Sequence, residues 1–341
     1  MKILVRAPNW IGDAVMATPA LSALRRRFPL DEIALLARPT IAALFEAHPD
    51  ISRCILYERP GRHDGLGGLL ALIRDLRRER FDLAVLFQNA FEAALISTAA
   101  GIPKRIGYAR DGRRFLLTAS CPTAHAPHHQ RTAYLHLTTL CGPELPHSSL
   151  LSDLPRLVVR PEERAEAARM AGWSETDIGI AIHPGAAYGP AKRWAPERFA
   201  AVADGLVQRF GARVVIVGSA TEREVSDAVG KAMTTPAVVL AGQTTVRQMM
   251  GLLARCRLLV TNDSGPMHVA AALGTPVVAV FGPTDPMATS PAGAPCSIVQ
   301  QPVDCAPCTH RVCPRLSDVH RCMTGVSVAS VLAAAETALD R

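Results

Sequence analysis

The sequence predicts an α/β fold in which two doubly wound, Rossmann-like domains, each built on a parallel sheet, face each other across a cleft. Its 341 residues are too many for one ordinary core and fit two domains of roughly 150 residues each. Short β-branched runs alternate with helical patterns in both halves, which is typical of parallel sheets. A proline-rich stretch over residues 143–161 separates the halves. We therefore expect domains over residues 1–155 and 156–341.

The expected elements follow the apolar runs. In the first half we expect strands over residues 3–6, 33–36, 54–57 and 83–86, and helices over 14–27, 39–47, 66–79 and 90–100. In the second half we expect strands over 178–182, 214–217, 237–240, 258–260 and 277–281, and helices over 196–209, 221–232, 244–254 and 264–273. Ligands of open α/β sheets bind at the carboxyl ends of the strands, so the loops that follow strands are the candidate sites.

Composition restricts the class of protein. Hydrophobic residues make up 49% and charged residues 20% of the sequence, which is ordinary for a globular protein. No apolar run approaches the roughly 20 residues that span a bilayer, and the N-terminus enters a strand-like run without the layout of a signal peptide. We therefore expect a cytoplasmic protein, whose nine cysteines are thiols or metal ligands rather than disulfides.

The positive charge is distributed unevenly. The net charge is +7, and residues 1–150 contain 19 Lys and Arg against 13 Asp and Glu, whereas the remainder contains 18 against 17. A one-sided basic surface indicates a polyanionic partner such as nucleic acid, anionic lipid or a phosphorylated glycolipid. The alternative is an ordinary solvated surface, and charge alone favours this second interpretation.

The first motif with chemical content is residues 6–14, directly after the first expected strand. Gly12 permits an unusual backbone angle or a close approach. Asp13 then lies near the start of a helix, where Asp is a common N-cap. A carboxylate at a strand end can also accept a proton from a hydroxyl nucleophile. The motif by itself favours the N-cap over the general base.

The second motif is residues 261–268, which follow a strand and open a helix. Pro266 suits the first turn. The free N–H groups of Ser264 and Gly265, with the helix dipole, form an anion site that fits a pyrophosphate. His268 also lies within reach of a phosphate there. The alternative is a capped helix with a core histidine, and the combination of Gly, Ser and His favours the phosphate site.

Two further loops follow strands. The loop over 183–194 is rich in Gly and Pro, and Lys192 and Arg193 lie just before the next helix. Positive charge there suits a departing phosphate, although a solvated Lys–Arg pair is equally compatible. In the loop over 218–222, Glu222 either holds ribose hydroxyls or complements a helix dipole.

The cysteine segment, residues 305–322, contains four of the nine cysteines with the spacing C-x2-C-x4-C-x8-C and has two histidines nearby. This spacing resembles a structural zinc knuckle. Free thiols or a disulfide are the alternative interpretation. We assign the cysteine segment no catalytic role. The four cysteines are Cys305, Cys308, Cys313 and Cys322.

Together these motifs resemble the ADP-heptose:lipopolysaccharide heptosyltransferases, with the heptosyltransferase II group as the nearest likeness. The resemblance spans nearly the whole chain. It rests on the residues over 9–13, 100–108, 184–194 and 262–273, and the last two are specific to that family. It implies a GT-B fold and an inverting transfer that needs neither metal nor cofactor.

The resemblance also implies roles for the site residues. Asp13 is then the general base, Lys192 contacts the donor phosphate and stabilises the leaving group, and Glu222 faces the ribose. We expect the donor site to comprise Gly12, Gly185, Lys192, Glu222, Asp263, Ser264, Gly265 and His268.

The implied partners are ADP-heptose and the lipid A–core acceptor, a phosphorylated glycolipid, and not nucleic acid. The resemblance therefore places the enzyme in the cytoplasm, peripheral at the inner face of the inner membrane. The basic first half would meet that anionic surface, and the candidate residues are Arg59, Arg62, Arg77, Arg78, Arg110, Arg113 and Arg114. The alternatives are heptosyltransferase I or another family member, a sugar-nucleotide epimerase, and a non-enzymatic nucleotide-sugar or lipid-binding protein.

Overall fold

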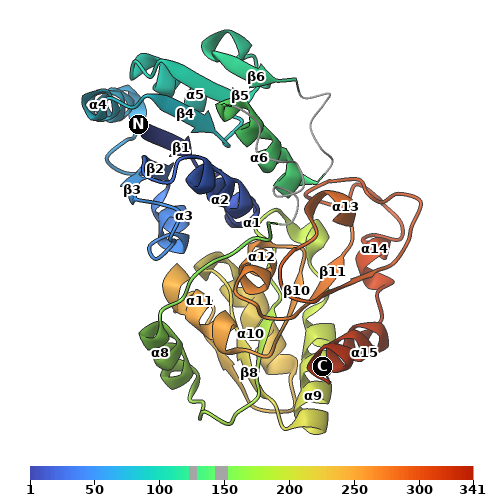
Figure 1. Cartoon of the computed structure of the whole chain (residues 1–341). Coiled ribbons are helices and arrows are strands. Elements are labelled where there is room, and N and C mark those ends of the chain that lie inside the picture. The colour runs from blue at the N-terminus through green and yellow to red at the C-terminus, as the bar shows by residue number, and fades with distance from the viewer. Residues whose placement is uncertain (123–128, 143–152, 341) are drawn as a thin grey trace. The chain divides into compact units, whose positions relative to one another are not determined.

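A computed structural model of the chain describes residues 1–122, 129–142 and 153–340. Most of the expected linker over 143–161 lies outside these residues. The chain forms two compact units, Met1–Val158 and Val159–Arg341, which Figure 1 shows in blue to green and in green to red. Each unit is a parallel sheet with helices, so the predicted fold class of two doubly wound α/β domains is confirmed.

The first unit contains a six-stranded parallel sheet in the order β3-β2-β1-β4-β5-β6. Four strands match the predictions from the apolar runs, whereas β5 and β6 were not predicted. The strands are β1 (Lys2–Arg6), β2 (Glu32–Ala37), β3 (Arg53–Leu56), β4 (Leu83–Leu86), β5 (Lys104–Tyr108) and β6 (Ala119–Cys121). This order is that of a Rossmann fold, with its reversal between β1 and β4.

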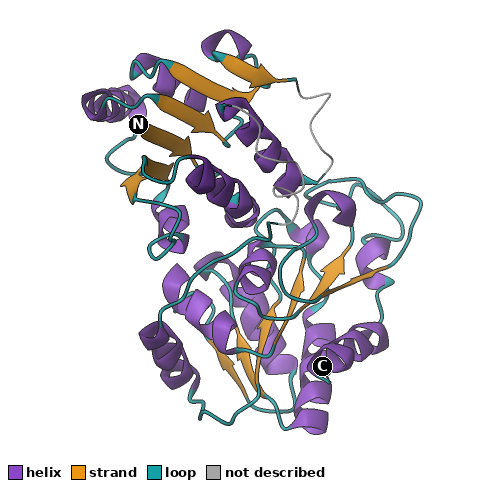
Figure 2. Cartoon of the chain, viewed as in Figure 1, coloured by secondary structure: helices purple, strands orange, loops and turns teal. Residues whose placement is uncertain are grey.

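The helices of the first unit border this sheet (Figure 2). They are α1 (Ile11–Met16), α2 (Thr18–Arg27), α3 (Pro39–Leu44), α4 (Gly65–Glu79), α5 (Phe91–Ala99) and α6 (Gln130–Thr138). The single helix expected over 14–27 is two helices, because Pro19 lies in the first turn of α2 and cannot donate the backbone hydrogen bond that a continuous helix requires there.

The second unit repeats the architecture with the order β12-β11-β10-β7-β8-β9. Five strands were predicted and β12 was not. The strands are β7 (Gly179–His183), β8 (Arg213–Ile216), β9 (Ala237–Val239), β10 (Leu258–Asn262), β11 (Val277–Phe281) and β12 (Cys296–Gln300). The order again reverses once, between β7 and β10, where doubly wound sheets bind their ligands.

The helices of the second unit include four that were predicted, α9 to α12. The helices are α8 (Pro161–Ala171), α9 (Pro196–Phe210), α10 (Arg223–Ala232), α11 (Val246–Arg255), α12 (Gly265–Ala272), α13 (Pro286–Thr289), α14 (Arg321–Thr324) and α15 (Val328–Leu339). Helix α9 ends at Gly211, whose φ of 64° is left-handed and stops the helix. No helix in the described part of the chain has the length and apolar character needed to cross a membrane.

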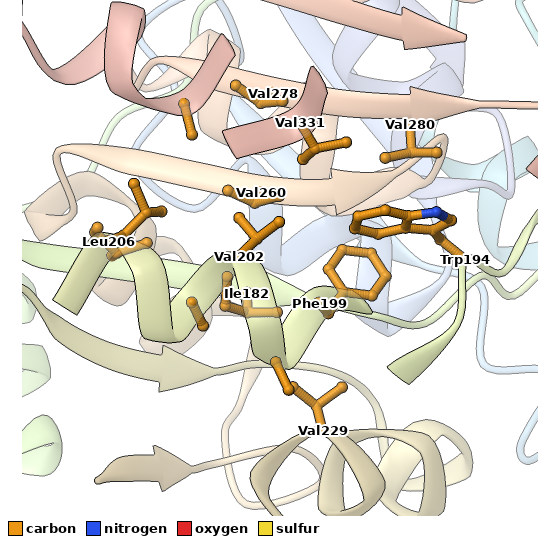
Figure 3. Packing of buried hydrophobic residues seen from close by; sticks show 14 of the residues in the cluster. Ile182, Trp194, Phe199, Val202, Leu206, Val229, Val260, Val278, Val280 and Val331 are labelled. Atoms are coloured by element: carbon orange, nitrogen blue, oxygen red, sulfur yellow. The ribbon is translucent and has the colours of Figure 1, made fainter. Parts of the chain in front are cut away.

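The core of the second unit explains why α9 packs on the sheet. Trp194 and Phe199 meet edge to face, with ring centroids 5.1 Å apart. Both are fully buried, together with Val260 of β10 and Val331 of α15. Figure 3 shows these side chains interleaved between the helices and the strands. Because Trp194 closes the loop over 184–194, this packing anchors one end of that loop.

Candidate active site

Asp13 lies in the first turn of α1, whose N-cap is Trp10. The N-cap interpretation of Asp13 is therefore wrong. The hydroxyl of Tyr134, from α6, donates to Oδ1 of Asp13 at 3.3 Å. Burial raises the pKa of Tyr134 well above its ordinary value, and the charge of Asp13 adds to the effect. Tyr134 is consequently a neutral donor that orients a half-buried carboxylate.

Hydrogen bonds to residues at the ends of β1 and β4, where the strand order of the first sheet reverses, hold the loop before α1. The backbone N–H of Asn9 donates to Oε1 of Gln88, which follows β4, at 3.1 Å. The guanidinium of Arg6, at the end of β1, donates to Oδ1 of Asn9 at 3.0 Å. Gly12 is the second residue of α1, so its backbone is helical, and of the two alternatives, an unusual angle or a close approach, the first is wrong. These contacts hold the segment that presents Asp13.

In the second unit, α12 begins where the anion site was predicted. Ser264 is the N-cap with extended backbone, and Pro266 lies in the first turn, as expected. The hydroxyl of Ser264 lies 3.0 Å from Nδ1 of His183. The side chain thus does not cap the helix. The backbone N–H groups of Ser264 and Gly265 begin the helix at its positive end, which is the arrangement that binds phosphate.

Lys192 and Asp263 are brought together in the same region. Nζ of Lys192, the last residue of the short 3-10 helix η4 (Pro190–Lys192), lies 2.5 Å from Oδ2 of Asp263, and the side chains are 12% and 6% exposed. The hydroxyl of Thr284 also donates to Oδ2, at 2.6 Å. The interpretation of Lys192 as a merely solvated residue is therefore wrong.

Glu222 is buried at the end of the 3-10 helix η5 (Ala220–Glu222), beside His183. Its Oε2 lies 3.5 Å from Nε2 of His183 and accepts from the N–H and hydroxyl of Ser219 at 2.9 and 2.7 Å. Burial alone would raise the pKa of Glu222, but the contacts with His183 and Ser219 outweigh it and lower the pKa to about 2. Glu222 is thus an ionised acceptor at neutral pH.

Gly185 permits the approach of Glu222 to the loop over 184–194. A Cβ added at Gly185 would lie 2.1 Å from Oε1 of Glu222, so any side chain there would displace this carboxylate. Gly185 thus leaves the space that the carboxylate of Glu222 occupies. His268 lies on α12 with 5% of its surface exposed, so it is a buried member of the helix that opens the anion site.

Four residues with a place in this arrangement were missed by sequence reasoning: His183, Asn262, Thr284 and Tyr134. The side chain of Asn262 accepts from the N–H of Trp194 at 3.0 Å and donates to the carbonyl of Pro184 at 2.8 Å, so it holds both ends of the loop over 184–194. A signal for His183 and Asn262 existed in the sequence, since each ends a buried strand beside the sheet reversal.

The cysteine segment lines a cavity of about 190 Å³. The residues that line it include Cys305, Cys308, Cys313, Cys322, His310 and His320. All nine cysteines are free, so the disulfide interpretation is wrong. Among the residues that the structure describes, no three His, Cys, Asp or Glu side chains are arranged to hold a metal ion.

The basic candidates of the first unit are not equivalent. Arg113 is fully buried and donates to the carbonyls of Tyr108 and Gln88 at 3.0 and 2.5 Å, so it supports the fold and cannot meet a surface. Arg59 and Arg62 form ion pairs with Glu92 and Asp75. Arg77, Arg78, Arg110 and Arg114 are exposed, and Arg110 pairs with Asp111 at 4.0 Å. The expectation for Arg113 is therefore wrong, because its loop turns the guanidinium inward.

Comparisons with known proteins identify the family of the chain. Residues 69–317 match the sequence pattern of the family described as Glycosyltransferase family 9 (heptosyltransferase). The chain is 34% identical over 303 residues to lipopolysaccharide heptosyltransferase 2 of Escherichia coli (strain K12), covering 85% of each protein.

Solved structures give the same result. The chain is similar to the structure of E. coli ADP-heptose lps heptosyltransferase II, with a TM-score of 0.84, 30% identity, and coverage of 99% of this chain and 98% of the other. It is also similar to a glycosyl transferase family 9 protein from Veillonella parvula DSM 2008, with a TM-score of 0.86, 26% identity, and coverage of 99% and 97%. The chain therefore belongs to glycosyltransferase family 9, the heptosyltransferases.

Proposed function

We propose that this glycosyltransferase moves heptose from ADP-heptose to the inner-core heptose of lipopolysaccharide, as heptosyltransferase II does, with inversion and without a metal ion. The observation that carries the proposal is the ion pair of Lys192 and Asp263 beside the start of α12. It combines a buried ammonium with a helix N-terminus, two positive groups suited to a pyrophosphate. The names of the relatives supply the sugar and the acceptor.

The donor site would work as follows. The pyrophosphate of the donor binds the N–H groups of Ser264 and Gly265 and the ammonium of Lys192. Asp263, which accepts a hydrogen bond from Thr284, holds that ammonium in place beforehand, so less side-chain entropy is lost when the donor binds. Glu222 is ionised and buried, and its carboxylate accepts hydrogen bonds from ribose hydroxyls.

The reaction is a single displacement. The acceptor hydroxyl loses its proton to Asp13 while its oxygen forms a bond to the anomeric carbon of the donor. The bond from that carbon to the ADP oxygen breaks on the opposite side, and configuration inverts. ADP leaves with the additional negative charge, which Lys192 and the start of α12 stabilise. The sequence contains no Asp-x-Asp pair that would hold a divalent cation for this purpose.

The acceptor side is proposed for the first unit. The acceptor is a phosphorylated glycolipid of the inner membrane, which the enzyme would meet from the cytoplasm as a peripheral protein. Arg110 and Arg114 are exposed on the basic first unit. Each basic residue near an anionic surface contributes about 1 kcal/mol of attraction.

The deciding experiment is incubation with ADP-heptose and a series of truncated lipopolysaccharides, with the products identified by mass. The proposal expects one heptose added to an acceptor that already carries one inner-core heptose. Addition to an acceptor without heptose would instead indicate a heptosyltransferase I. Isomerisation of ADP-heptose in the absence of any acceptor would indicate an epimerase, and binding without turnover a non-enzymatic protein. Any of these three results would contradict the proposal.

A further inference from the structure

The cysteine segment has no role in the reaction proposed above, yet part of it packs against the donor loop, residues 184–194. The hydroxyl of Tyr188 donates to the carbonyl of Thr309 at 2.7 Å. The backbone N–H of Ala191 donates to the carbonyl of Arg311 at 3.1 Å. The cysteine segment is thus hydrogen-bonded to the donor loop on both sides of Gly189.

Because Gly189 has no side chain, the backbone of the donor loop packs directly against the backbone of the cysteine segment. A Cβ added at Gly189 would lie 2.4 Å from the carbonyl oxygen of Arg311 and 3.0 Å from its Cα. Both neighbours are main-chain atoms, which cannot rotate away as a side chain can. The position of the donor loop therefore depends on the position of residues 309–311.

The ring of Tyr188 connects this contact to Lys192. Nζ of Lys192 lies 5.0 Å from the ring centroid, and the guanidinium carbon of Arg311 lies 5.1 Å from it. A cation at this distance from an aromatic ring is attracted to the ring's negative face. The ammonium of Lys192 thus has two neighbours that restrict it, the carboxylate of Asp263 and the ring of Tyr188.

These contacts form a closed ring of interacting residues. The N–H groups of Cys308 and Thr309 donate to the carbonyl of Pro283 at 2.9 and 2.8 Å, and the next residue, Thr284, donates to Asp263. The path therefore runs from Lys192 through Asp263 and residues 283–284 to Thr309, and returns through Tyr188. Because the contacts form a ring, the position of each of these residues depends on the positions of the others.

We propose that Tyr188 is a positioning residue, which transmits the placement of the cysteine segment to the ammonium of Lys192 and so strengthens binding of the donor pyrophosphate. The inference rests on the proposed role of Lys192. Its physical basis is preorganisation: a long, flexible side chain that is already held in place loses less rotamer freedom when a phosphate binds.

The test measures ADP binding by titration calorimetry, which requires no acceptor. Tyr188→Leu, which removes both ring and hydroxyl, should weaken ADP binding by about 5-fold, because cation–π contacts of this kind are modest. Tyr188→Phe keeps the ring but loses the hydrogen bond to Thr309, so its affinity should lie between those of Tyr188→Leu and the wild type. Phe210→Leu is the matched control, since Phe210 also lies near a cation, Arg209, at 5.4 Å, but on α9 outside the donor loop; its affinity should equal that of the wild type.

A double-mutant cycle separates positioning from a general structural effect. If Tyr188 acts through Lys192, then Tyr188→Leu should cause no further loss of ADP affinity in a Lys192→Ala background. Full additivity of the two losses would overturn the inference, as would equal affinity of Tyr188→Leu and wild type. If Lys192→Ala by itself leaves ADP affinity unchanged, the proposed donor site is wrong and the inference falls with it. Only this last result contradicts the proposed function as well.

Discussion

Nε2 of His183 lies 3.5 Å from Oε2 of Glu222 in the buried part of the second unit. The other ring nitrogen, Nδ1, lies 3.0 Å from the hydroxyl of Ser264. An ionised carboxylate only accepts hydrogen bonds, so Nε2 bears the hydrogen that points to Glu222. Nδ1 also lies 3.1 Å from the hydroxyl of Thr261. One buried side chain therefore connects the expected ribose carboxylate to the turn that opens the anion site.

The first prediction follows from the ionisation of Glu222. Its pKa of about 2 in the folded protein lies below the ordinary value of 4.5. A lowered pKa stabilises the fold above pH 4.5, and this contribution is lost as the pH falls from 4.5 towards 2. The size of the shift corresponds to roughly 3 kcal/mol in the free energy of unfolding.

Urea unfolding of wild type and Glu222→Gln between pH 7 and pH 3 measures this effect. The difference in free energy of unfolding should be largest near neutral pH and should shrink below pH 4.5. Glu224→Gln is the control, because Glu224 is exposed in the first turn of α10. The difference in free energy of unfolding between this variant and the wild type should not shrink below pH 4.5. A Glu222→Gln difference that stays constant with pH would contradict the environment described for Glu222.

Asp13→Asn should abolish most transfer while ADP binding survives. The asparagine oxygen can still accept from Tyr134, so the orientation of the side chain is retained and only the basicity is lost. Loss of a general base lowers the rate by about 10²–10⁴-fold. Steady-state rates with a defined acceptor measure this, beside Asp75→Asn as a control that lies on α4 of the same unit. Near-normal turnover of Asp13→Asn would remove Asp13 from the mechanism.

Treatment with EDTA should leave the rate of transfer unchanged. The charge on the departing ADP is offset in the proposed mechanism by Lys192 and the start of α12, two groups that a chelator does not remove. The measurement is the initial rate before and after dialysis against EDTA, with thermal melting recorded in parallel. A loss of rate that magnesium or manganese restores would show that a cation performs this role instead.

The double change Arg110→Glu and Arg114→Glu should impair transfer to a membrane-embedded acceptor more than to a deacylated, water-soluble one. Both residues are exposed on the basic unit. Exposed charges are screened beyond about 8 Å at physiological salt, so the defect should diminish as salt increases. Arg113 is excluded from the test, because reversal of a buried guanidinium would damage the fold itself.

The control for this prediction applies the same charge change to the second unit. Arg164→Glu and Arg169→Glu alter two exposed residues of α8, and this variant should use both acceptors like the wild type. The donor KM should be unaffected in the Arg110 and Arg114 variant, since the groups proposed to bind the donor phosphates and ribose, Lys192, Glu222 and the start of α12, belong to the second unit. Equal defects with both acceptors would rule out attraction to the membrane surface as the cause.

The sequence by itself determined the central strands and the loops that follow them. Strands such as β4 and β11 are buried along their whole length, and burial on both faces requires continuous apolar runs, which can be read locally. Strands β5, β6 and β12 were not predictable in this way. Strand β5 begins with Lys104 and Arg105, β6 has three residues and β12 is only half-buried, because strands near a sheet edge are partly solvated and need not be apolar.

The tertiary structure alone decided which side chains meet. Lys192 and Asp263 are 71 residues apart and His183 and Ser264 are 81 apart, and no local pattern pairs them. They meet because β7 and β10 are neighbours at the reversal of the sheet, with His183 in register with Thr261. The burial of Arg113 also depends on tertiary packing, because its guanidinium donates to the carbonyls of Tyr108 and Gln88. Local sequence sets backbone preference and apolar periodicity, whereas burial and hydrogen-bond partners depend on how distant strands pack.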